Sequence, residues 1–123
     1  MPVRFLLDEQ MRGKPLWHAL RRLQSSGSFA IDVIRVGDAP DLPLGTTDPD
    51  ILIWSEREGR ILISEGRRTI TRHLAEHLRS GQTSPGIFVV RRGASLADVV
   101  RWLQLVAIDD DPGAWRDQAT FIP

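Results

Sequence analysis

Cysteine is absent from the 123 residues of this chain. Disulfide bonds, thiolate metal sites and a cysteine nucleophile are therefore excluded. Long apolar runs are also absent, because no stretch approaches the roughly 20 residues that a membrane-spanning helix needs. The first residues, Met1-Pro2-Val3-Arg4, do not open a secretory signal pattern. We therefore expect a cytoplasmic protein with no membrane partner.

Net charge is missing as well, since the chain has 16 acidic and 16 basic residues. This balance removes the simplest sign of nucleic-acid binding, a strongly basic chain, but leaves room for a local basic patch. Lysine is nearly absent: Lys14 is the single lysine, and all other basic residues in that count are arginines. Arginine suits phosphate because its planar fork donates two hydrogen bonds at once. The codon bias of a GC-rich genome is the alternative explanation.

Glycine-rich phosphate loops are absent too, because the sequence has neither G-x-G-x-x-G nor G-x-x-x-x-G-K. A nucleotide-binding Rossmann domain therefore lacks its fingerprint. What the chain does have is an ordinary globular composition, with 41% hydrophobic and 26% charged residues. The length fits one domain, residues 1–123, and leaves little room for two.

Short apolar runs alternate with segments of helical periodicity along the whole chain. A helix is expected from Pro15, a second from the Thr47-Asp48-Pro49 start to Gly59, a third over 69–79 and a fourth after Ser95. The tail, 120–122, is expected to be a last strand or an edge cover. The other strands are expected at 3–7, 31–36, 61–63 and 86–90. Alternation of this kind predicts an α/β fold with a parallel sheet and helices on both faces.

Acidic and hydroxyl side chains follow three of these predicted strands. Because the carboxyl ends of parallel strands form the binding edge of such a sheet, we expect these side chains to gather there. Carboxylates gathered at one edge repel one another unless a cation lies between them, and oxygen ligands suit Mg²⁺ or Mn²⁺. Such a metal would activate water for phosphodiester cleavage. The candidates are Asp8, Glu9, Asp48, Asp50, Ser64 and Glu65.

Several candidates have a purely structural alternative. Asp48 and Asp50 would stabilise a helix N-terminus, where negative charge is favoured, and Glu9 would be a solvated neighbour of Asp8. His73 and His77 are four residues apart and could share a helical face, but no third metal ligand is placed by the sequence, so packing is the favoured role. Another candidate group is a basic stretch that would hold phosphate or form a solvated helix face: Arg67, Arg68, Arg72 and Arg79.

Four segments together resemble the PIN-like nuclease family, in its branch of small stand-alone prokaryotic proteins. They are F-L-L-D-E-Q, D-P-D-I-L-I-W, E-G-R-I-L-I-S and S-P-G-I-F-V-V, and the tail W-R-D-Q-A-T-F-I-P also resembles that branch. The resemblance spans nearly the whole chain. It implies a three-layer α/β/α sandwich with a mostly parallel sheet of four to five strands. It also implies a Mg²⁺- or Mn²⁺-dependent ribonuclease, in many relatives the toxin of a toxin–antitoxin pair.

By this resemblance Asp8 is the first metal-binding acid, and Asp48, which opens the second helix, is another. Glu65 stands one residue before the family's third acid position and would assist them. Arg67, Arg68 and Arg72 would bind nucleic acid, with Glu9, Asp50 and Ser64 as secondary site residues. RNA, an antitoxin protein and a second copy of the chain are the implied partners. The sequence departs from the family pattern at Gly66, where an aspartate is expected, at Arg68, which replaces another acid, and at Gln10, which replaces an asparagine.

Two alternatives are open: the departures motivate the first, and the acids at the end of the first predicted strand motivate the second. The first is a catalytically degenerate PIN-like module that acts by binding nucleic acid or protein. The second is a receiver-like signalling domain, which needs a phospho-acceptor aspartate after the third strand and a lysine near a later strand. Here the third predicted strand ends in Ser64-Glu65, and Lys14 lies in the first helical segment.

Overall fold

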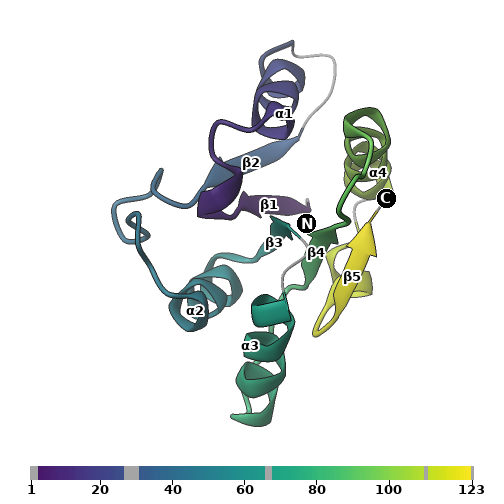
Figure 1. Ribbon diagram of the computed structural model, residues 1–123. Coiled ribbons are helices and arrows are strands. Elements are labelled where there is room, and N and C mark those ends of the chain that lie inside the picture. The colour runs from purple at the N-terminus through teal and green to yellow at the C-terminus, as the bar shows by residue number, and fades with distance from the viewer. Residues whose placement is uncertain (1–2, 27–30, 66–67, 110, 123) are drawn as a thin grey trace.

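The computed structural model describes residues 3–26, 31–65, 68–109 and 111–122. Strands and helices alternate along the chain (Figure 1). The strands are β1 (Arg4–Leu7), β2 (Asp32–Arg35), β3 (Arg60–Glu65), β4 (Ile87–Val90) and β5 (Ala119–Ile122). The helices are α1 (Pro15–Ser26), α2 (Asp48–Glu58), α3 (Arg68–Arg79) and α4 (Leu96–Asp109), with two short 3-10 helices, η1 (Glu9–Met11) and η2 (Pro112–Trp115).

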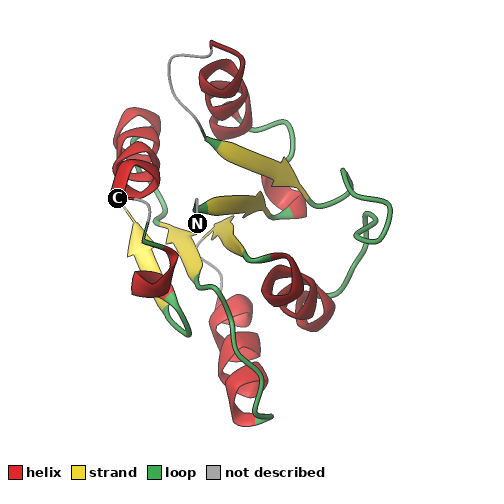
Figure 2. Cartoon of the chain, turned by 180° about the vertical axis from the view of Figure 1, so that it is seen from behind, coloured by secondary structure: helices red, strands yellow, loops and turns green. Residues whose placement is uncertain are grey.

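All five strands run parallel, in the order β2-β1-β3-β4-β5. One buried cluster joins one face of the sheet to α1 and α4, and a second joins the other face to α2 and α3. Figure 2 shows the helices arranged around the sheet from the opposite side. The predicted α/β sandwich with a parallel sheet is confirmed, and the tail is its fifth strand.

Local sequence signals explain where α2 begins and ends. Thr47 is the residue before the first turn and Pro49 lies inside that turn, where its missing N–H costs nothing. Asp48 and Asp50 place negative charge at the N-terminus of the helix. Gly59 ends it with a left-handed backbone (φ 68°). The long loop before α2, residues 36–47, contains no helix or strand and has two prolines and two glycines, which disfavour regular structure.

The end of the sheet at β5 is fixed by aromatic packing. The Phe88 ring lies 5.1 Å from the Trp115 ring and 6.2 Å from the Trp102 ring, both edge to face. Trp115 lies in η2 and Trp102 in α4, so the three rings join β4 to the two elements that precede β5 in the chain. Such pairs add about 0.5–1.5 kcal/mol each beyond their area burial. The tail is thereby held against the sheet.

The strand order determines where a ligand would bind. The chain crosses from β1 to β2 by α1 on one face, and from β2 to β3 by α2 on the other. In open parallel sheets, ligands bind outside the carboxyl ends of the strands where the order reverses. Here that point lies between β1 and β3. Among the described residues, no helix is long and apolar enough to cross a membrane.

Candidate functional site

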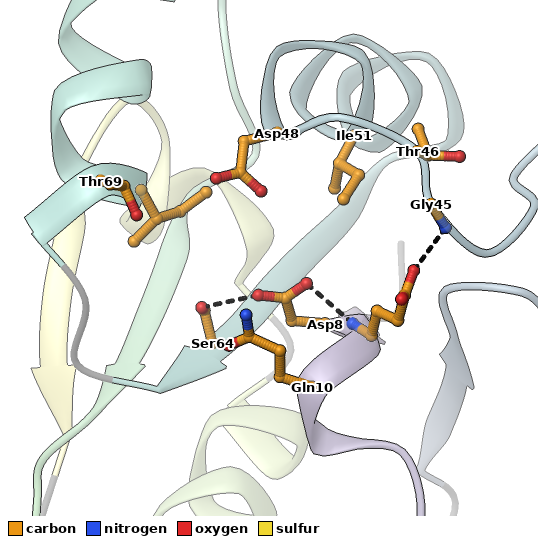
Figure 3. A pocket seen from close by; sticks show the side chains of 10 residues that line it. Asp8, Gln10, Gly45, Thr46, Asp48, Ile51, Ser64 and Thr69 are labelled. Atoms are coloured by element: carbon orange, nitrogen blue, oxygen red, sulfur yellow. Dashed lines mark hydrogen bonds between the residues drawn. The ribbon is translucent and has the colours of Figure 1, made fainter.

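A hollow of about 190 Å³ lies at the point between β1 and β3 (Figure 3). Its walls come from the segment after β1, the end of the long loop, the first turns of α2 and α3, and the end of β3. Its exposed lining surface is mostly polar. The lining residues are Asp8, Glu9, Gln10, Gly45, Thr46, Asp48, Ile51, Ser64, Thr69 and Ile70.

Asp8 lies at the centre of this hollow and is 9% exposed. One carboxylate oxygen accepts a hydrogen bond from the Glu9 backbone N–H (2.7 Å), which caps η1. The other accepts from the Ser64 hydroxyl (2.9 Å), and Ser64 is 1% exposed. The Asp8 backbone N–H also donates to the carbonyl of Ile63 (3.0 Å). Both β1 and β3 therefore fix the orientation of this carboxylate.

Asp48 faces Asp8 from the first turn of α2. Figure 3 shows its carboxylate pointing into the same space as that of Asp8. The sequence places Asp48 there because Thr47 and Pro49 set the start of the helix. One Asp48 oxygen lies 3.8 Å from Nε2 of His73 on α3. The structure thus brings two of the three predicted metal-binding acids to one cavity.

Glu9 has a different role from the one expected of a solvated neighbour. Its carboxylate accepts a hydrogen bond from the Gly45 backbone N–H at 2.6 Å. Gly45 has a left-handed backbone (φ 84°), which favours glycine. Glu9 therefore ties the end of the long loop to the segment after β1. This contact shapes one wall of the hollow.

Glu65 does not line the hollow, unlike its neighbour Ser64. Successive side chains of a strand point to opposite faces, so only one of these two can reach the space beside Asp8. One Glu65 carboxylate oxygen instead lies 3.8 Å from the Lys14 ammonium, and both side chains are largely exposed. Glu65 therefore lies on the α1 side of the sheet edge.

The remaining predicted residues are more dispersed. Asp50 is exposed, accepts a hydrogen bond from the Thr47 hydroxyl (3.2 Å) and does not line the hollow. Arg72 is exposed on α3, and Arg68 is the first residue of that helix. Gly66 and Arg67 lie outside the described residues. Two of the predicted acids thus share the hollow, whereas Arg72 does not line it.

The histidines have separate roles. His77 is buried, as its predicted packing role requires, and its Nε2 donates to the Thr83 carbonyl at 2.7 Å. His73 lies between the carboxylates of Asp48 and Glu76, 3.8 Å from each. Within the described part of the chain, no group of three or more His, Asp or Glu side chains is arranged to hold a metal ion.

Sequence reasoning missed part of the lining. Gln10 and Thr69 contribute an amide and a hydroxyl, and Ile51 and Ile70 are the apolar residues of the lining. Thr69 lies in the first turn of α3, close in sequence to the arginines that were predicted to bind phosphate. A search for every polar residue within three positions of a predicted strand or helix end would have included both Gln10 and Thr69.

Comparison of this chain with protein-family models, with curated proteins and with solved structures finds no match. The fold by itself does not assign a function to this chain, because one fold supports many activities.

Proposed function

We propose that this chain is a PIN-like domain that cleaves RNA with the help of Mg²⁺ or Mn²⁺ bound at Asp8 and Asp48. The observation that carries the proposal is the pair of carboxylates facing one polar hollow at the reversal of strand order. Two carboxylates that face the same space repel each other, and a cation between them would offset this repulsion.

The donor chemistry of the hollow fits a hard divalent cation. Its polar side chains offer carboxylate, hydroxyl and amide oxygens, and no sulfur. Mg²⁺ is commonly held by one or two carboxylates, with water and substrate phosphates as its other ligands. The third carboxylate of the lining, Glu9, is bonded to the Gly45 backbone N–H. Two carboxylates, Asp8 and Asp48, are therefore left to face the hollow, which is compatible with such a site. When bound, the cation would supply activation of water and neutralisation of phosphate charge.

The chain's own residues would do the positioning. Ser64 and the Glu9 N–H hold the Asp8 carboxylate in one orientation. Asp48 sits across the hollow on the rigid start of α2, and Glu9 fixes the loop that borders the substrate side. A site built on strand ends and helix starts keeps its ligands in place, which metal-assisted cleavage needs.

Cleavage of a labelled single-stranded RNA in Mn²⁺ tests the proposal. Asp8→Asn and Asp48→Asn should each lower the rate by at least about a hundredfold, since supporting residues around metals already act on a scale of ten- to a hundredfold. Glu65→Gln is the matched control, because it removes a carboxylate that does not line the hollow. Equal losses in all three variants, or no cleavage by the wild type, would contradict the proposal.

A second candidate is a domain that binds nucleic acid or protein without cleaving it. It is favoured by Glu65, which pairs with Lys14 instead of completing a three-acid site. Robust cleavage by the wild type that disappears in Asp8→Asn would rule it out.

A receiver-like domain is less well supported, although its sheet shares this strand order. The β3 side chain beside Asp8 is Ser64, not an aspartate that could accept a phosphoryl group. Absence of labelling by a small phosphodonor would exclude this reading.

The toxin role is a separate prediction from the resemblance. Expression of the wild type should then arrest growth and Asp8→Asn should not. An antitoxin and a homodimer would be sought by co-purification and by sedimentation.

A further inference from the structure

An exposed aromatic ring lies in the same row of the sheet as the acidic hollow. Ser64 in β3 is the register partner of Val89 in β4, and Val89 is the partner of Phe121 in β5. Register partners in a parallel sheet point to the same face, so Phe121 shares the face of the hollow. Two strand spacings separate Ser64 from Phe121, or about 10 Å.

Phe121 is an unusual residue for this position. It is 52% exposed, whereas Val89 beside it is fully buried. Ala119, two residues earlier on the same side of the strand, packs against the buried cluster under α2 and α3. This face of the sheet is therefore buried as far as β4, whereas the Phe121 side chain on β5 is exposed to solvent.

Arg91 lies over this ring, with its guanidinium carbon 5.4 Å from the ring centre. Its backbone N–H donates to the carbonyl of Ile122 (3.3 Å), which fixes the end of β4 beside the end of β5. Arg91 and Arg92 are both exposed. Neither has a carboxylate partner among the described residues, whereas six arginines in other parts of the structure do: Arg4, Arg12, Arg35, Arg57, Arg60 and Arg116.

We propose that Phe121 and Arg91 form a stacking site for one base of a single-stranded nucleic acid whose backbone continues into the hollow at Asp8. Bases stack on aromatic rings and on arginine planes, and this interaction tolerates any sequence. The uncompensated charge of Arg91 and Arg92 suits the phosphate backbone on either side of that base.

The geometry suits a strand that passes from the stacking site to the hollow. α3 packs on the same sheet face, and its first turn supplies Thr69 and Ile70 to the wall of the hollow. A strand between the two sites would therefore pass the N-terminus of α3, where backbone N–H groups favour phosphate. This inference rests on the proposed function for the identity of the ligand, but its test does not depend on cleavage.

Fluorescence anisotropy with a short labelled oligouridine, in EDTA so that no metal supports cleavage, measures the stacking site directly. Phe121→Leu keeps the apolar volume and removes the aromatic face, so it should weaken binding about tenfold. Phe121→Trp should retain binding. The control is Leu105→Ala, because Leu105 is also an exposed apolar residue but lies on α4. This variant should bind the oligouridine as tightly as the wild type.

A ribose-phosphate chain of the same length without bases separates stacking from charge. Its binding should not change in Phe121→Leu, whereas Arg91→Gln should weaken the binding of both chains. The inference is overturned if the wild type binds neither chain or binds both equally, or if Phe121→Leu matches the wild type. It is also overturned if Phe121→Leu abolishes association of two copies of the chain along β5, because the ring would then contact protein and not a base. Base-dependent binding without cleavage in Mn²⁺ would contradict the proposed function alone.

Discussion

Replacement of Gly86 by alanine should destabilise the protein through two effects that add, backbone strain and a steric clash. Gly86 has a positive φ of 121°, and a Cβ added there would lie 2.3 Å from the carbonyl oxygen of Trp115. A side chain in the left-handed region costs about 1–2 kcal/mol. Displacing a packed backbone group adds about 1–3 kcal/mol. Together they amount to about 2–5 kcal/mol, a large part of a typical domain's 5–15 kcal/mol.

Gly81→Ala is the control that separates the two effects. Gly81 also has a positive φ, 89°, but an added Cβ would meet no atom within 4 Å. Urea unfolding followed by tryptophan fluorescence should show a loss of about 1–2 kcal/mol for Gly81→Ala. The loss for Gly86→Ala should be larger by about 1–3 kcal/mol. Equal losses in both variants would refute the claim that the turn before β4 packs tightly against η2.

Three further perturbations test other parts of the structure. Burial raises the pKa of Asp38, but hydrogen bonds from Arg35 outweigh this effect and hold the pKa below its ordinary 3.8. Asp38 therefore stabilises the fold above pH about 4, and this stabilisation is lost as the pH falls through the lowered pKa. In urea titrations Asp38→Asn should lose about 1 kcal/mol of stability at pH 7, and its stability should decline less than that of the wild type towards pH 3. Glu9→Ala should speed hydrogen exchange at the Gly45 amide, and unchanged exchange would contradict the tether. Arg60→Met should cost about 2 kcal/mol, because the buried guanidinium donates to a carbonyl of β1 and a carboxylate of β2, and a neutral effect on the urea midpoint would contradict it.

The fold could be predicted from the sequence because its signals are local. The Thr47-Asp48-Pro49 start and Gly59 bound α2 as expected, and the alternation of strands and helices predicts the parallel sheet. Strand order could not be predicted, since every order of five parallel strands is compatible with the same alternation. The tail could be a strand or a cover until the contacts of Trp115 fix it beside β4.

The site residues that could be predicted are those whose position depends only on where a strand ends or a helix begins. Asp8 and Asp48 reach the hollow because they follow a strand and open a helix. The role of Glu65 could not be predicted from its spacing, because a shift of one residue along a strand moves a side chain to the opposite face of the sheet. Ser64, a secondary candidate, is the one that bonds to Asp8. The Glu9 contact with Gly45 spans a long loop, and no local pattern encodes it.

Calorimetric titration with Mn²⁺ tests the central claim most directly, with wild type, Asp8→Asn and Glu65→Gln compared under the same conditions. Mn²⁺ binding by the wild type and by Glu65→Gln, with loss of binding in Asp8→Asn, is the result that the two-carboxylate hollow predicts. Absence of Mn²⁺ binding in the wild type would contradict a metal-dependent nuclease. Equal loss in Glu65→Gln and Asp8→Asn would contradict the assignment of the site to this hollow.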